Sequence, residues 1–190
     1  YKSLTDKAYT FLVLCGAKGI GKGQLQKLIR ALHGRDNFVE GKRETISGTF
    51  NGQIQDTRLL WFDEIRYDKP EANNLKRIIN DSISIERKGI DATRSTDIHA
   101  SIVLSNNDLT DNYMELDDRR FSPLELTDTK LTKKFDVAWF DEFNYHVDDL
   151  GERSPLVAKF GHWLLEYGKC EKIDRQEPYK AEKFKEIVTA

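Results

Sequence analysis

The 190-residue sequence has little of what several classes of protein require. It contains only two cysteines and four histidines, and neither residue type is spaced as in a metal or redox site. No apolar run approaches the length of a membrane-spanning helix, and no signal peptide, internal repeat or low-complexity segment is recognisable. We therefore expect no membrane association and a reduced, cytoplasmic setting.

Neither sign of charge is in large excess. The sequence has 30 basic and 32 acidic residues, which gives a formal net charge of −2. Bulk electrostatics thus give no sign of nucleic-acid binding, and any such contact has to come from a few placed lysines and arginines. Hydrophobic residues make up 38% and charged residues 33%, which fits one globular domain rather than disorder. The sequence starts at Tyr1 rather than methionine, so we expect it to be a piece of a longer polypeptide.

The most informative segment is a glycine-rich stretch that follows the apolar run 11–15 and precedes an amphipathic pattern over 24–33. A strand, a glycine loop and a helix in this order form the context of a phosphate-binding P-loop. Successive backbone N–H groups of such a loop hold phosphate oxygens, and Lys22 adds a point charge. The residues predicted to bind the nucleotide are Gly16, Ala17, Lys18, Gly19, Ile20, Gly21, Lys22, Gly23 and Gln24.

The eighth position of this motif departs from the usual pattern, because Gly23 stands where a serine or threonine hydroxyl contacts Mg²⁺. One interpretation is that phosphate oxygens, waters and a carboxylate hold the ion, with slower turnover. The other is a degenerate site that binds nucleotide without hydrolysing it.

Polar side chains end two further apolar runs. Asp63 and Glu64 follow residues 58–62, and Asn106 follows residues 101–105. Ligands collect at the carboxyl edge of a parallel sheet. We predict that Asp63 is the metal ligand, that Glu64 activates the attacking water, and that Asn106 contacts the γ-phosphate or that water.

The alternation of strand and helix patterns predicts an α/β fold with a mostly parallel sheet flanked by helices. Asp68 and Pro70 open a predicted helix, and Ser154 caps a later one that ends at Gly168. We expect a core of residues 1–130 and a helical extension, 131–190, packed on the core or on a neighbour. The remaining expectations are an irregular connection over 35–57, strands over 84–88, 96–104 and 122–126, and a hairpin tip over 89–94.

Taken together, these motifs resemble the superfamily 3 helicases, the compact AAA+ motors of DNA viruses, phages and plasmids. The resemblance rests on residues 16–23, 59–64, 102–106 and 119–121, which occur in the order of that family. Segments 48–52 and 118–121 are similar to the helicase modules of viral and phage primase–helicases and primase–polymerases. The likeness covers roughly residues 10–127, and no family signal is found in 131–190.

The resemblance implies a P-loop NTPase fold, ATP and Mg²⁺ as cofactors, and a ring, usually a hexamer, in the cytoplasm of a host cell. It implies an arginine that acts on the nucleotide of the neighbouring subunit, and Arg120 matches best, with Arg119 second. It also implies a basic hairpin that contacts single-stranded or forked DNA, for which Arg87, Lys88 and Arg94 are available. A linked primase or polymerase domain is expected as a further partner.

The sequence therefore favours an ATP-dependent DNA helicase domain that serves the replication of a phage or mobile element. A nucleotide-binding module for oligomerisation or loading, with weak or no hydrolysis because of Gly23, is the alternative. A small-molecule P-loop kinase is the third hypothesis, but the chain shows no acceptor pocket and only Arg119 and Arg120 as lid arginines.

Overall fold

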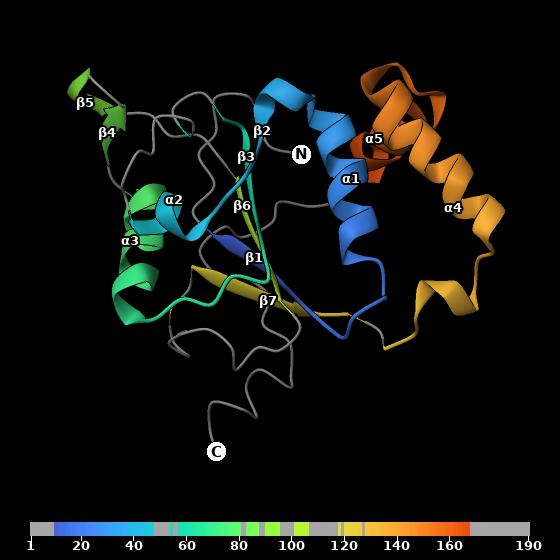
Figure 1. Cartoon of the computed structure of the whole chain (residues 1–190), viewed down its shortest axis with the longest axis horizontal. Helices are drawn as coiled ribbons and strands as arrows, with labels where there is room; N and C mark the ends of the chain where they lie inside the picture. Colours follow the sequence, from blue (N-terminus) through green and yellow to red (C-terminus); the bar gives the residue numbers. More distant parts are fainter. Residues whose placement is uncertain are drawn as a thin grey trace.

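The computed structural model describes residues 10–47, 54, 57–80, 83–87, 90–95, 101–106, 118, 120–126 and 128–167. Figure 1 shows most of the strands in the middle of the molecule, with helices on either side and β4 and β5 at one corner. The elements are β1 (Phe11–Cys15), α1 (Lys22–His33), η1 (Arg35–Asn37), β2 (Phe38–Glu40), α2 (Arg43–Ser47), β3 (Leu59–Asp63), α3 (Lys69–Asn80), β4 (Ile83–Arg87), β5 (Ile90–Ser95), β6 (Ser101–Asn106), β7 (Phe121–Glu125), η4 (Leu131–Lys133), α4 (Val137–Asn144), η5 (Tyr145–Leu150), η6 (Gly151–Arg153) and α5 (Pro155–Tyr167).

The main sheet has five strands in the order β2-β3-β6-β1-β7, and every neighbouring pair is parallel. The predicted α/β fold with a parallel sheet is thus confirmed. Cys15 lies opposite Asn106, and Asp63 lies opposite Ser105. Because parallel strands end on the same edge, the residues that follow β1, β3 and β6 meet there.

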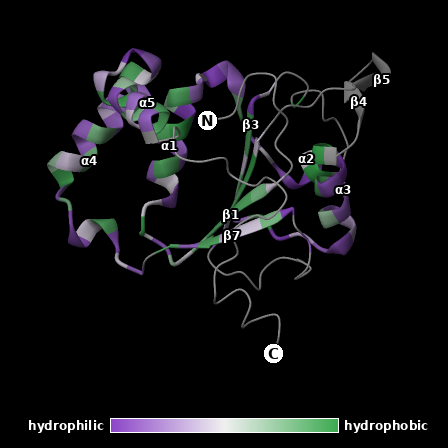
Figure 2. Cartoon of the chain, turned by 180° about the vertical axis from the view of Figure 1, so that it is seen from behind, coloured by the Kyte–Doolittle hydropathy of each residue, from purple (hydrophilic) through white to green (hydrophobic). Residues whose placement is uncertain are grey.

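Both faces of this sheet are covered by helices. Leu14, Trp61 and Val103 point to one face and pack against Leu25 and Ile29 of α1. The opposite face carries the larger cluster, in which strand side chains such as Phe11 and Phe62 meet residues from α2 and α3. Strands buried on both faces read as continuous apolar runs, which is why β1 and β3 are recognisable in the sequence. Figure 2 shows these strands as hydrophobic ribbons between more polar helices.

The start of α3 and the end of α1 follow from local sequence. Asp68 accepts a hydrogen bond from the N–H of Glu71 at 3.2 Å, and the Glu71 carboxylate accepts one from the N–H of Asp68 at 3.1 Å. This reciprocal pair is a capping box, and it starts α3 where Asp68 and Pro70 predicted a helix. Gly34, with φ of 84°, ends α1 and returns its N–H to the carbonyl of Arg30, also as predicted.

Two boundary predictions are wrong. Residues 35–57 are not wholly irregular, because they contain the short elements η1, β2 and α2. Of the predicted strand 96–104, residues 101–104 lie in β6 of the main sheet, and 96–100 lie outside the described residues. The preceding strand, β5, pairs with β4 as an antiparallel hairpin. The predicted tip 89–94 therefore falls largely inside β5. Its β-branched residues, among them Ile90 and Thr93, form strand instead of turn.

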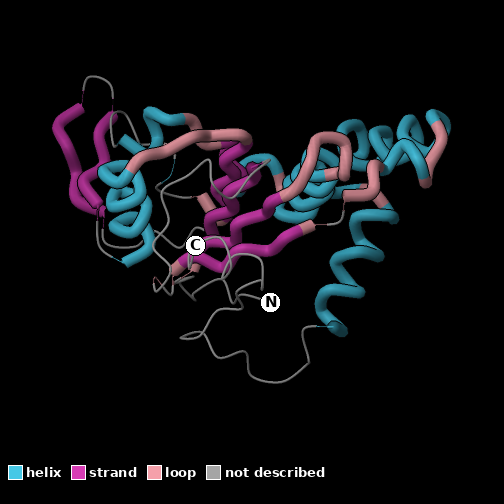
Figure 3. The backbone as a smooth tube through the Cα atoms, turned by 90° about the horizontal axis from the view of Figure 1, so that it is seen from below, coloured by secondary structure: helices cyan, strands magenta, loops and turns pink. Residues whose placement is uncertain are grey.

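The described part of the extension, residues 131–167, is mostly helical and packs on the outer side of α1 (Figures 1 and 3). Val147 and Val157 bury a small cluster against Ala31 of α1. Asp148 binds Lys27 at 2.7 Å and Arg30 at 2.8 Å, so ion pairs reinforce the apolar contact. Ser154 caps α5 through a hydrogen bond from the N–H of Val157 at 3.3 Å, as predicted.

Only some of the apolar side chains of α5 are covered. Val157 is buried, but Leu156 and Trp163 are exposed. Gly168, the predicted end of this helix, lies outside the described residues. None of the helices in the described ranges is long and apolar enough to cross a membrane.

Candidate functional site

The glycine loop between β1 and α1 turns through backbone conformations that a side chain would oppose. Gly19 has φ of 85° and Gly21 has φ of 108°. A β-carbon on Gly21 would also lie 2.5 Å from Cδ1 of Leu131. Glycine at this position therefore serves two needs, a left-handed turn and a close neighbour. The N–H of Leu25 closes the first turn of α1 on the carbonyl of Gly21 at 2.9 Å.

Lys22 lies inside this loop rather than in solvent. Its residue exposure is 8%, and its ammonium donates hydrogen bonds to the carbonyl oxygens of Gly16 and, at 3.1 Å, of Ala17. Both of these acceptors are neutral backbone carbonyls. The start of α1 adds the positive end of a helix at the same place. The loop is thus electrically suited to an anion.

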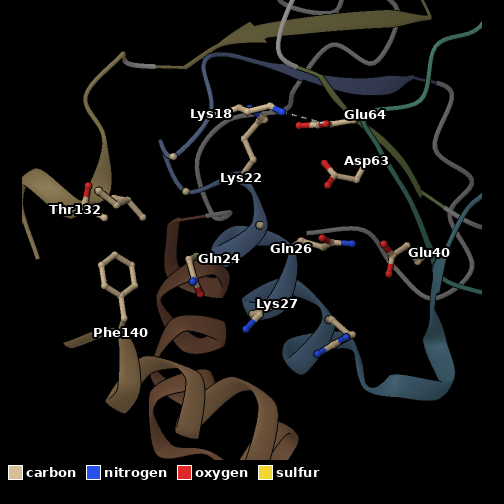
Figure 4. Close-up of a pocket in the computed structure, with 15 residues that line it drawn as sticks. Lys18, Lys22, Gln24, Gln26, Lys27, Glu40, Asp63, Glu64, Thr132 and Phe140 are labelled. Carbon is tan, nitrogen blue, oxygen red and sulfur yellow. Dashed lines mark ion pairs between the residues drawn. The ribbon is translucent and has the colours of Figure 1, made fainter. Parts of the chain in front are cut away.

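Asp63 and Glu64 face the loop from the end of β3 (Figure 4). Glu64 is the one residue other than glycine with positive φ, 50°, among those described. Its N–H bonds the carbonyl of Ser105 on β6 at 2.7 Å, which holds this conformation. Strained backbone of this kind is retained where it aims a side chain. The Glu64 carboxylate lies 4.0 Å from the ammonium of Lys18, and both groups are largely open to solvent.

A pocket of about 480 Å³ joins the loop to these carboxylates. Eight of the sequence-predicted residues line it: Lys18, Gly19, Gly21, Lys22, Gly23, Gln24, Asp63 and Glu64. Sequence reasoning missed seven others, namely Gln26, Lys27, Arg30, Glu40, Leu131, Thr132 and Phe140. The first three follow the loop on α1 and a helical wheel would have found them. The last three come from more than a hundred residues away, and no local signal marks them.

Asn106 lies beside this pocket without lining it. It ends β6, the strand between β1 and β3, and is 3% exposed. Its carbonyl accepts a hydrogen bond from the N–H of Gly16 at 3.2 Å, so Asn106 contacts the first residue of the glycine loop directly. The structure therefore brings Lys22, Asp63, Glu64 and Asn106 to one edge of the sheet.

Arg120 lies at the opposite edge of the sheet. It precedes β7, which runs parallel to β1, and its carbonyl accepts from the N–H of Phe11 where β1 begins. The length of β1 thus separates it from the loop of its own chain. Its guanidinium binds Asp118 at 3.1 Å, and the ammonium of Lys76 binds the same carboxylate at 2.7 Å. Arg119, the second choice, lies outside the described residues.

Asp118 is the buried anchor of this group. Burial by itself raises the pKa of the Asp118 carboxyl, but the hydrogen bond and charge of Lys76 and the contacts of Arg120 together outweigh it and lower the pKa. A carboxylate whose folded pKa is depressed contributes stability above its unfolded pKa and loses it as the pH falls through the folded value. The anchor thus holds Arg120 at neutral pH.

The hairpin of β4 and β5 carries two of the three basic residues predicted for DNA contact. Arg87 pairs with Ile90 at the turn, whereas Arg94 pairs with Ser84, farther along the strands. Arg94 is therefore not at the tip, contrary to the predicted tip range. Lys88 lies outside the described residues. Figures 1 and 3 show the hairpin on the far side of the molecule from the helical extension.

The oxygen donors of the pocket suit Mg²⁺ better than a transition metal. Within the described part of the chain, no group of three or more His, Cys, Asp or Glu is placed to hold a metal ion. The pocket instead offers exposed carboxylates from Asp63 and Glu64. An ion held mainly by phosphate oxygens and water, with one or two protein carboxylates, is the usual arrangement for Mg²⁺.

Comparison with known proteins supports this fold. A family model described as "Family of unknown function (DUF5906)" matches residues 14–120. No curated protein matches the chain significantly. Among solved structures, an apo structure of the NrS-1 C-terminal region has 22% sequence identity and a TM-score of 0.71, and the match covers 97% of this chain. A second apo structure of that region has 21% identity and a TM-score of 0.72 over 97% of the chain.

A structure of JCV helicase has 14% identity and a TM-score of 0.50, and the match covers 96% of this chain and 50% of that one. The chain spans only 43% of the NrS-1 region in each of the two structures. At these identities the likeness concerns the fold. It confirms the helicase-like P-loop fold that the motifs predicted.

Proposed function

Because this chain belongs to DUF5906, a family of unknown function, and has a superfamily 3 helicase-like fold, we propose that it is an ATP-dependent DNA helicase domain. One observation carries the proposal. A single pocket contains the glycine loop with Lys22 on one side and the carboxylates Asp63 and Glu64 on the other. Phosphate binding and water activation require these two groups to face each other across a space of this size.

The binding step uses the loop as it stands. Phosphate oxygens replace the carbonyls of Gly16 and Ala17 as acceptors for the ammonium of Lys22. This exchange replaces neutral acceptors of the ammonium by anionic ones, which favours the bound state. Backbone N–H groups of the loop and the start of α1 hold the remaining oxygens.

The hydrolytic step assigns one role to each residue at the carboxyl edge. Asp63 would hold Mg²⁺, which neutralises the charge that develops on the phosphates. Glu64 takes the proton of the attacking water, and its constrained backbone fixes the direction of its carboxylate. Asn106 lies between the two sides and contacts the terminal phosphate or the water.

The partners that we propose follow from where the other residues lie. Arg120 is at the wrong edge for its own pocket, so we assign it to the nucleotide of a neighbour in a ring, a hexamer in the full-length protein. The basic residues of the hairpin, Arg87, Lys88 and Arg94, contact the phosphates of single-stranded or forked DNA without reading bases. A linked primase or polymerase domain completes this proposal, with action in the replication of a phage or mobile element.

The first test combines calorimetric titration of the whole 190-residue chain with ATP, its phosphate release with and without single-stranded DNA, and its mass by light scattering. We expect ATP and DNA together to raise both the hydrolysis rate and the mass, because Arg120 completes a pocket only between subunits. Absence of any ATP binding would contradict the proposal. Tight binding without turnover, even where the mass shows a ring, would favour the second candidate below.

A binding and assembly module is that second candidate, and Gly23 favours it. The pocket shows no steric reason for glycine there, because a β-carbon on Gly23 would meet nothing within 4 Å. The φ angle of Gly23 is not positive either. The missing hydroxyl is therefore a chemical feature of the pocket and not a by-product of tight packing.

Replacement of Gly23 by serine is expected to increase hydrolysis at limiting Mg²⁺ by about tenfold, equivalent to about 1.4 kcal/mol. The reason is that a hydroxyl in open space beside the loop can join the coordination of the ion. Phosphate release against Mg²⁺ concentration measures it. Gly23→Ala is the matched control, since it also removes the helix-propensity cost of glycine, about 1 kcal/mol relative to alanine, but carries no oxygen. Equal rates for the two variants would contradict a metal role for this position.

A further inference from the structure

The pocket extends past the glycine loop on the side away from the carboxylates. Leu131, Thr132 and Phe140 form this part of its wall. Figure 4 shows Thr132 and Phe140 across the start of α1 from Asp63 and Glu64. A triphosphate whose terminal group faces Asp63 and Glu64 has to direct its other end toward this wall. The wall is therefore where a nucleoside would lie.

The segment before α4 is fixed to the loop by direct contacts. The N–H of Leu131 donates to the carbonyl of Gly19 at 2.9 Å. The Leu131 side chain fills the space over Gly21, where a β-carbon would come within 2.5 Å of it. The wall is thus built against the loop itself, and its distance from bound phosphates is set by these contacts.

Phe140 is the aromatic residue of this wall. Its ring meets Trp139 edge to face, with centroids 5.1 Å apart. Trp139 in turn stacks on Phe135 at 4.1 Å and on Phe143 at 5.1 Å. Phe140 is only partly buried and lines the pocket. A ring held by its neighbours and open to a pocket can stack on a planar base at little entropic cost.

Gln24 contributes the polar group. It sits in the first turn of α1 and lines the same pocket (Figure 4). Its carboxamide oxygen is shielded from solvent and accepts no hydrogen bond within the part of the chain that the structure describes. Leaving a shielded acceptor without a donor is unfavourable, so a ligand N–H at this place would be stabilised. Adenine presents an exocyclic amine, whereas guanine presents a carbonyl oxygen at the equivalent position.

We propose that Phe140 and Gln24 form a nucleobase subsite that favours adenine, with Phe140 stacking on the base and the Gln24 oxygen accepting from its exocyclic amine. This inference rests on the proposed nucleotide function and adds the part of the ligand that the phosphate motifs do not specify. It also assigns a binding role to the helical extension, which carries Phe140 on α4.

The test compares three ligands, ATP, GTP and inorganic tripolyphosphate, by calorimetric titration of the whole chain. Wild type is expected to bind ATP more tightly than GTP and tripolyphosphate. Phe140→Ala should weaken ATP by about tenfold and leave tripolyphosphate unchanged, because only the base is lost. Gln24→Leu should bring the affinities for ATP and GTP together. Phe140→Tyr, which keeps a ring, should retain ATP affinity and guards against a folding defect in the alanine variant.

Phe135→Leu is the matched control, because it disturbs the same aromatic cluster without removing a residue of the pocket wall. An equal loss of ATP and tripolyphosphate in Phe140→Ala would overturn the subsite, as would unchanged ATP affinity in that variant. Wild-type binding of tripolyphosphate as tight as that of ATP would overturn the subsite and leave the phosphate site standing. Failure to bind any of the three ligands would instead contradict the proposed function, and the subsite with it.

Discussion

Replacement of Lys22 by alanine is expected to weaken ATP binding at least about a hundredfold and to abolish hydrolysis. A hydrogen bond to a charged group contributes about 1.5–3 kcal/mol, and the upper part of that range corresponds to this loss. Lys22 is 8% exposed and already lies among the carbonyls of the loop, so it needs little reorganisation to meet a phosphate. Titration calorimetry with ATP measures the effect.

Lys18 supplies the matched control for this experiment. It belongs to the same loop and lines the same pocket, but its side chain is 78% exposed and its distance to the Glu64 carboxylate is 4.0 Å. Exposed ion pairs of this kind contribute up to about 1 kcal/mol, so Lys18→Ala should cost fivefold in affinity or less, roughly. Similar losses in the two variants would show that the loop attracts anions by net charge alone. Unchanged affinity in Lys22→Ala would contradict the site.

Replacement of Glu64 by glutamine is expected to lower the hydrolysis rate by about a hundredfold or more while ATP binding persists. Glutamine has nearly the same shape but cannot accept the proton of the attacking water. It also keeps a β-carbon, so the strain of the positive φ at this position, about 1–3 kcal/mol, is the same in both proteins. The substitution therefore isolates proton transfer from backbone geometry.

Single-turnover phosphate release and ATP titration together test this expectation. Glu40→Gln removes a carboxylate from the same pocket, on β2, and should leave the rate nearly unchanged. Loss of ATP affinity in Glu64→Gln would assign the residue to binding. A hydrolysis rate close to that of wild type would contradict the role of Glu64 as the base and would make Asp63 the next residue to test for that role.

The parts of the fold that follow from local patterns are those that the sequence predicted. The apolar runs of β1 and β3 are recognisable because both of their faces are covered. The start of α3 is marked by hydrogen bonds between Asp68 and Glu71, which are only three positions apart. The glycine loop needs its particular residues for backbone reasons, as Gly21 shows. Such signals survive without knowledge of the rest of the chain.

What the sequence did not predict depends on partners distant in the chain. Residues 90–94 belong to the predicted hairpin tip, but they form strand because β5 pairs with β4, whereas β6 pairs with β1 and β3. The place of Arg120 at the far edge follows from the parallel pairing of β7 with β1. Phe140 reaches the pocket because Val147 and Val157 pack on α1, a contact that no motif encodes.

The hydrogen bond from Leu131 to Gly19 shows that the unit that folds and the unit that forms the pocket do not have the same boundaries. As a folding unit, the parallel sheet with its two layers of helices is complete by the end of β7. The pocket is not complete at that point, because residues of the following segment form one of its walls. A boundary drawn at the last strand would preserve the architecture and cut through the pocket. We therefore expect substitutions in the residues of the extension that line the pocket to change its shape without altering the core itself.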